Sequence, residues 1–121
     1  MFKPVFYWTL VILYAALIFY LSSGPMPITI DIPESDKIGH MGEYGIFSLL
    51  LYKALRSSFK NESAWKIAIL SIIVTLLYGI SDEFHQIFVP TRTADPYDVA
   101  ADASGAIIMQ GIIHIKKRFF A

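Results

Sequence analysis

The sequence contains no cysteine and few charged residues. Without cysteine, the chain can form neither a disulfide framework nor a thiolate metal site. Charged residues make up 17% of the 121 residues, whereas 55% are hydrophobic, so the charged outer faces of a water-soluble helix bundle are missing. Repeats, low-complexity segments and long linkers are also missing from the sequence. We therefore expect residues 1–121 to form a single domain.

The hydrophobic residues gather in four runs, at roughly residues 5–21, 38–55, 65–80 and 99–115. Each run is close to the ~20 residues that a helix needs to cross ~30 Å of hydrocarbon. With their polar ends included, the runs predict helices at approximately 5–21, 36–55, 64–89 and 96–115, the third ending before Pro90 and the fourth beginning after Asp95. This pattern predicts an all-α integral membrane bundle of four transmembrane helices.

The basic residues are distributed unevenly along the chain. Eight of the ten lie at the N-terminus, in the second connection and at the C-terminus: Lys3, Lys53, Arg56, Lys60, Lys66, Lys116, Lys117 and Arg118. By the positive-inside rule, both termini then lie on the cytoplasmic side of a bacterial cytoplasmic membrane. Nine of the ten acidic residues, all but Glu62, fall on or near the opposite side. Because the basic residues are ordinary flanks of spanning helices, they do not indicate nucleic-acid binding.

Ionisable residues of three predicted helices fall at a similar depth in the membrane. Counted from the basic flanks at ~1.5 Å per residue, His40, Asp82 and Asp102 lie roughly 20 to 25 Å above the cytoplasmic edge. Such groups cost a few kcal/mol each if they face lipid, so they should face inward and pair with one another. We therefore expect a polar cluster at the extracytoplasmic end of the bundle.

The residues expected in this cluster could bind a ligand, perform acid–base chemistry or hold a metal. The ligand-binding candidates are Asp36, Lys37, His40, Tyr44, Asp82, Glu83, Gln86, Arg92, Asp98 and Asp102. The catalytic candidates are His40, Glu43, Asp82, Glu83, Asp98 and Asp102. The candidates for a divalent metal are His40, Glu83, Asp98 and Asp102, because imidazole with carboxylates suits Zn, Mn or Fe. A structural network, neutralised by Lys37 and Arg92, is the alternative.

The order of these residues resembles a known family. Residues 36–44 read D-K-x-x-H-x-x-E-Y, residues 78–98 read Y-G-x-x-D-E-x-H-Q-x-F-V-P-x-R-x-x-D-x-x-D, and Gly105-Ala106 follows. This pattern is similar to that of the VanZ-like family of small bacterial membrane proteins. Carried over by position, the motif residues are Asp36, Lys37, His40, Tyr44, Asp82, Glu83, Gln86, Pro90, Arg92, Asp98 and Gly105. Asp102 departs from the pattern, since the family usually has Asn there, and Met109 stands where Gly is common.

The resemblance implies a role in the cell envelope, because the namesake of the family is associated with low-level resistance to the glycopeptide teicoplanin. It does not imply a particular reaction. One hypothesis is that the chain binds or modifies a lipid, a cell-wall precursor or a glycopeptide at the outer leaflet. A second is that the carboxylates and His40 form an intramembrane hydrolase or transferase, with or without a metal, acting on a lipid headgroup. A membrane scaffold without chemistry is the third, and the oligomeric state stays open.

Overall fold

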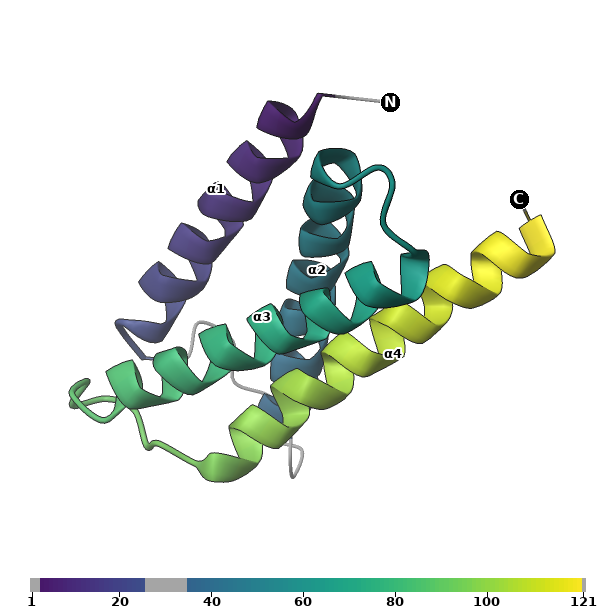
Figure 1. The fold of residues 1–121 in the computed structure, drawn as a ribbon. Helices are drawn as coiled ribbons and strands as arrows, with labels where there is room; N and C mark the ends of the chain where they lie inside the picture. The colour runs from purple at the N-terminus through teal and green to yellow at the C-terminus, as the bar shows by residue number, and fades with distance from the viewer. Residues whose placement is uncertain (1–2, 26–34, 121) are drawn as a thin grey trace.

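The structure, a computed structural model, describes residues 3–25 and 35–120, and these residues form four α-helices and no strand (Figure 1). The helices are α1 (Pro4–Ser22), α2 (Ser35–Ser58), α3 (Ala64–Gln86) and α4 (Pro96–Phe120). The prediction of an all-α chain with four helices is therefore confirmed for this part of the protein. Asp31 and Glu34, two of the acidic residues counted above, lie outside the described residues.

The third helix, α3, ends earlier than its sequence suggests. α3 ends at Gln86 rather than at Val89. The backbone N–H groups of Ile87, Phe88 and Val89 donate to carbonyls three residues earlier, so the chain tightens after Gln86. Because Pro90 disfavours the α conformation in the residue before it, Val89 cannot continue the helix. The start of α4 is as predicted: Asp95 Oδ1 accepts the backbone N–H of Tyr97 at 2.9 Å, and Pro96 takes the first helical position.

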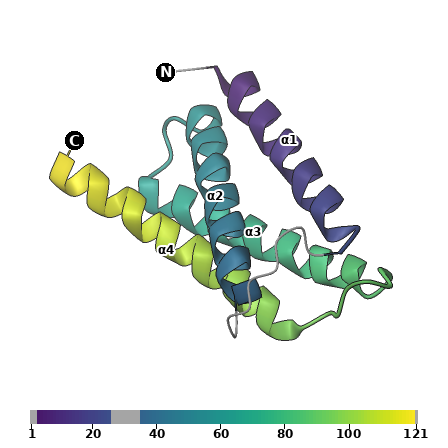
Figure 2. The same ribbon diagram turned by 180° about the vertical axis from the view of Figure 1, so that it is seen from behind.

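α2 is the central helix of the bundle. It packs against α1, α3 and α4, whereas α1 and α4 do not meet within the described residues. α3 and α4 run antiparallel beside each other and cross α2 obliquely (Figures 1 and 2). The largest apolar cluster fills the space between α1 and α2 and includes Ile18, Tyr44, Phe47 and Leu51.

The two termini and the α2–α3 connection lie toward one end of the molecule, and the α3–α4 connection lies at the other (Figures 1 and 2). Trp8 Nε1 donates to Ser58 Oγ at 2.8 Å, which ties the start of α1 to the end of α2. Lys117 Nζ donates to the Tyr52 hydroxyl near the end of α4. The helix ends that carry the basic flanks therefore lie toward the same end of the bundle (Figures 1 and 2).

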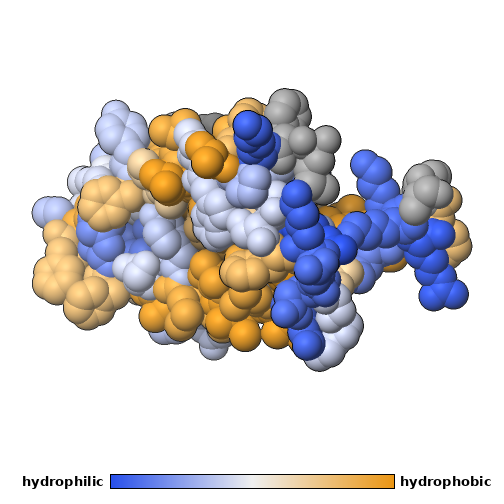
Figure 3. All heavy atoms as spheres, turned by 45° about the horizontal axis from the view of Figure 1, so that its top comes forward, coloured by the Kyte–Doolittle hydropathy of each residue, from blue (hydrophilic) through white to orange (hydrophobic). Residues whose placement is uncertain are grey.

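Large apolar side chains cover much of the outside of the bundle (Figure 3). Leu13, Leu77 and Ile112 are 61%, 59% and 52% exposed and come from three different helices. Exposed apolar surface of this kind marks an interaction site or a membrane-facing surface when it is contiguous. Two helices, α1 and α3, are long and apolar enough to cross a membrane by length and composition. α2 and α4 carry more polar residues, so spanning by all four helices stays a prediction.

The crossing of α2 and α4 generates a prediction about Gly105. A Cβ added to Gly105 would lie 2.2 Å from the backbone oxygen of Met41, so the helices would have to separate. We expect Gly105→Ala to destabilise the protein by about 1–3 kcal/mol, the range for overpacking. The matched control is Gly111→Ala, because a Cβ there meets nothing within 4 Å on the same helix. Thermal unfolding in detergent measures both variants, and an equal melting temperature for the two would contradict this close crossing.

Candidate functional site

The end of the bundle that carries the α3–α4 connection buries polar side chains from all four helices. Those that are nearly inaccessible are Ser22, His40, Tyr44, Asp82, Glu83, Gln86, Asp98 and Asp102. Asp102 is 0% exposed and Asp98 is 4% exposed, although each is a carboxylate. Buried polar groups need partners because an unpaired one costs about 1–3 kcal/mol. Their hydrogen bonds therefore determine how the helices meet at this end.

Asp82 connects three helices through its two oxygens. Its Oδ1 accepts the hydroxyl of Ser22 from α1. Its Oδ2 accepts the hydroxyl of Tyr44 from α2 at 2.9 Å and the amide of Gln86, one turn further along α3, at 3.3 Å. The sequence predicted that Asp82 and Gln86 share a helix face, and both side chains are buried on it. The contact with Ser22 was not predicted.

His40 connects α2 to α4. Its Nδ1 lies 2.8 Å from Asp102 Oδ1, and its Nε2 lies 3.5 Å from Asp98 Oδ2. The side chain of Asp102 also packs against α3, where a Cβ on Gly79 would come within 2.7 Å of Asp102 Oδ2. Glycine at position 79 thus leaves room for the carboxylate that orients the imidazole.

Lys37 binds three carboxylates at the edge of the site. Its Nζ lies 2.9 Å from Asp36 Oδ2, 2.7 Å from Asp95 Oδ2 and 2.6 Å from Asp98 Oδ1. The Lys37 ammonium, together with the backbone N–H of Tyr97, holds the pKa of Asp95 below its ordinary value. Lys37 therefore joins the start of α2 to the start of α4. Its positive charge is balanced by the three carboxylates around it.

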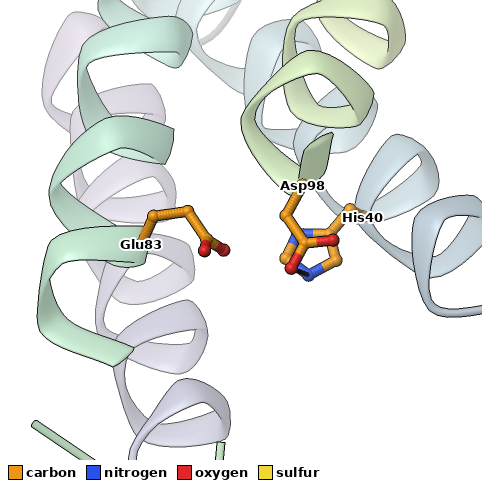
Figure 4. Close-up of side chains that lie close together, drawn as sticks. All are labelled: His40, Glu83 and Asp98. Carbon is orange, nitrogen blue, oxygen red and sulfur yellow. Dashed lines mark ion pairs between the residues drawn. The ribbon is translucent and has the colours of Figure 1, made fainter. Parts of the chain in front are cut away.

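Glu83 reaches into the site from α3 (Figure 4). Its Oε2 accepts the backbone N–H of Asp95 at 2.8 Å, which ties the last turns of α3 to the start of α4. Its Oε1 is buried and has no hydrogen-bond partner. Glu83, Asp98 and His40 each offer one atom to a common region, and these atoms lie within 4.8 Å of one another.

Arg92 donates hydrogen bonds to backbone carbonyls at and just after the end of α1. Its Nε donates to the carbonyl of Gly24 at 2.6 Å, and its Nη2 donates to the carbonyl of Leu21 at 2.6 Å. These carbonyls belong to the end of α1, where a helix lacks internal donors. The guanidinium therefore fixes the α3–α4 connection against α1, and a contact between Arg92 and a ligand stays a prediction.

The remaining predicted residue, Glu43, is half-buried on the same stretch of α2. Its backbone carbonyl accepts the Tyr14 hydroxyl at 2.7 Å. Sequence reasoning did not include Ser22 and Asp95 among the site residues, although both contact it. It also missed a second buried pair, Gln110 and Ser48, in which Gln110 Nε2 donates to Ser48 Oγ at 2.7 Å. A lone amide in an otherwise apolar run was the signal for Gln110.

The cluster holds more negative groups than positive ones. Its carboxylates are Asp36, Glu43, Asp82, Glu83, Asp95, Asp98 and Asp102, and its permanent cations are Lys37 and Arg92. Like charges at this density require protons, a metal ion or a cationic ligand. An open pocket of about 400 Å³, lined by Lys37, Asp95, Tyr97 and Ala101, borders the cluster. The arrangement can therefore bind a ligand or cation, and His40 with Asp102 can exchange a proton.

These features define a class: an all-α membrane protein whose helices enclose a carboxylate-rich site at one end. Residues 5–117, nearly the whole chain, match the model of the VanZ/LLP1 family. The chain therefore belongs to this family, as its motif predicted. Neither a curated protein nor a solved structure matches the chain significantly.

The role of Asp82 generates a stability prediction. Asp82→Ala leaves the donors of Ser22, Tyr44 and Gln86 without their acceptor, so we expect a loss of about 3 kcal/mol. The matched control is Glu62→Ala, because Glu62 is an exposed carboxylate whose contact is an ion pair with Lys66 at 3.7 Å. Unfolding in detergent, followed by tryptophan fluorescence, compares the two variants. Equal stability of both would show that Asp82 does not connect the helices.

Proposed function

We propose that the chain spans the bacterial cytoplasmic membrane four times, with both termini in the cytoplasm and the carboxylate-rich site at the outer face. α2 and α4 are 24 and 25 residues long, and at ~1.5 Å per residue each exceeds ~30 Å of hydrocarbon. Their polar residues His40, Asp98 and Asp102 are buried, so they do not face lipid. The gathering of basic residues at the opposite end supports the orientation.

The function that this site supports best is binding of the polar part of an envelope molecule at the outer leaflet. The candidates are a lipid headgroup, a cell-wall precursor and a glycopeptide, and such binding would alter susceptibility to teicoplanin. The observation that carries the proposal is the excess of carboxylates beside an open pocket lined by Lys37, Asp95, Tyr97 and Ala101. Carboxylates accept hydrogen bonds from hydroxyl, amide and ammonium groups, which all these molecules carry. Membership of the VanZ/LLP1 family supports an envelope role.

A second candidate function is hydrolysis or transfer at a lipid headgroup. The observation in its favour is the pair of His40 Nδ1 and Asp102 Oδ1 at 2.8 Å, beside a Glu83 oxygen without a partner. An imidazole held by a carboxylate is the arrangement of a general base. In this reading, His40 and the carboxylates activate water or a lipid hydroxyl, with or without a metal.

The orientation is tested with single cysteines, since the native sequence has none. Thr93 and Asn61 are exposed and lie in the α3–α4 and α2–α3 connections. A membrane-impermeant thiol reagent added to intact cells should label Thr93→Cys and spare Asn61→Cys. Both should react after the cells are opened. Labelling of Asn61→Cys alone in intact cells would show that the orientation is the opposite of the one proposed.

Ligand binding is tested with purified protein in lipid nanodiscs, using teicoplanin, a phospholipid headgroup analogue and a lipid-linked cell-wall precursor as probes. We expect at least one probe to bind and Asp98→Asn to weaken it by about 10- to 100-fold, as for the loss of a charged hydrogen bond. Glu62→Gln, at the opposite end, should bind like the unchanged protein. Formation of a product in the unchanged protein but not in a His40 variant would favour the second candidate function, an enzyme. If the unchanged protein binds none of the probes, the hypothesis of a membrane scaffold without chemistry is favoured.

A further inference from the structure

We propose that His40, Glu83 and Asp98 form a binding site for one divalent transition-metal ion, with Zn²⁺ as the expected occupant. The three residues come from α2, α3 and α4, and Figure 4 shows Glu83 pointing toward Asp98 and His40. One imidazole nitrogen with two carboxylate oxygens is a ligand set for Zn²⁺, Mn²⁺ or Fe²⁺ rather than for Ca²⁺ or Mg²⁺. The metal site goes beyond the envelope ligand proposed above, since either could exist without the other.

The hydrogen bond between His40 and Asp102 leaves the other imidazole nitrogen available. An ionised carboxylate only accepts hydrogen bonds, so the 2.8 Å contact with Asp102 Oδ1 assigns a proton to His40 Nδ1. Nε2 then faces Asp98 Oδ2 at 3.5 Å. A neutral imidazole would direct a lone pair at that carboxylate, which is unfavourable unless a positive charge lies between them. Histidine ligands of metals commonly donate their second N–H to a carboxylate in this way.

The burial and hydrogen bonding of Glu83 support a bound cation independently of the net charge of the cluster. The residue is 8% exposed, and its Oε1 has no hydrogen-bond partner. Its other oxygen is held at 2.8 Å by the backbone N–H of Asp95, which fixes the direction of the carboxylate. A buried carboxylate oxygen without a partner is destabilising. A cation in front of Oε1 removes that penalty.

Asp98, like His40 and Glu83, has one polar atom held by a neighbouring group and a second polar atom that is not. Its Oδ1 accepts from Lys37 Nζ at 2.6 Å, and its Oδ2 faces His40. Each of the three side chains is thus held by one atom, which leaves its second atom available to a ligand. Lys37 is itself bound by Asp36 and Asp95, which moderates its repulsion of a metal ion.

The distances permit a metal ion after small movements. Two ligand atoms that each lie about 2.1 Å from Zn²⁺ can be no more than about 4.2 Å apart. The candidate atoms of His40, Glu83 and Asp98 lie within 4.8 Å of one another, so the most distant of them would have to move closer together around an ion. Three protein ligands leave at least one coordination position for water or a bound molecule.

Protons could satisfy the same atoms without a metal. A second proton on His40 would bridge Asp98 and Asp102, and a proton on Glu83 would neutralise its carboxylate. The experiment must therefore measure the metal itself. Protein purified with a tag that contains no histidine is stripped with a chelator, equilibrated with Zn²⁺, desalted and analysed for metal by mass spectrometry.

We expect about one Zn²⁺ per chain in the unchanged protein and at least a tenfold weaker affinity in His40→Ala, Glu83→Gln and Asp98→Asn. Asp102→Ala should weaken the affinity by about 10- to 100-fold, as for other carboxylates behind a histidine ligand. His114→Ala is the matched control, because His114 Nδ1 contacts the carbonyl of Gln110 far from the cluster. Substitution of Co²⁺ adds a readout of coordination, whose visible absorption should disappear in Glu83→Gln.

The proposal is overturned if the unchanged protein takes up no stoichiometric metal, or if Glu83→Gln and His40→Ala both bind it like the control. Glu83→Gln preserves the size of the side chain, so it carries the test if His40→Ala does not fold. Binding of the envelope probes is measured before and after chelation. A protein that binds a probe but takes up no metal would overturn the metal site alone, and a protein that takes up metal but binds no probe would overturn the proposed ligand alone.

Discussion

The burial of carboxylates in an apolar bundle is the constraint on which the rest of the structure depends. Asp82 and Asp102 are 5% and 0% exposed, so their charges cannot be solvated by water. Their donors come from other helices: Ser22 and Tyr44 for Asp82, and His40 for Asp102. Each such bond has a defined direction and forms only when donor and acceptor face each other. The carboxylates therefore fix the register of α1, α2 and α4 against one another.

The division between polar interior and apolar exterior explains why two of the helices have modest hydropathy. α1 and α3 are long and apolar enough to cross a membrane by length and composition, whereas α2 and α4 are less apolar on average. Many of the residues that lower their hydropathy, including His40, Ser48, Asp98 and Gln110, are buried. Residues on their exposed faces, such as Ile46, Ile108 and Ile112, are apolar. An average over a helix does not distinguish a polar buried face from an apolar exposed one.

The sequence predicted the elements that follow from regular geometry. Four apolar runs located the helices, and depth counting at ~1.5 Å per residue brought His40, Asp82 and Asp102 to one end, where the structure also has them. The features that depend on the path of a connection could not be predicted. Arg92 donates to Leu21 and Gly24, and the backbone of Asp95 donates to Glu83, because the α3–α4 connection folds back over two helix ends. The early end of α3 has the same origin, since backbone bonds after Gln86 tighten the chain before Pro90.

The aspartate at position 102, where the VanZ-like pattern usually has asparagine, adds a negative charge to the site. An asparagine could accept the same hydrogen bond from His40 Nδ1 through its amide oxygen. Only the carboxylate adds a full negative charge 2.8 Å from the imidazole. That charge stabilises a positive charge on the far side of the ring, whether a proton or a metal ion carries it. Because His40 Nε2 faces Asp98, a cation at the site proposed above would be held more strongly with aspartate at position 102 than with asparagine.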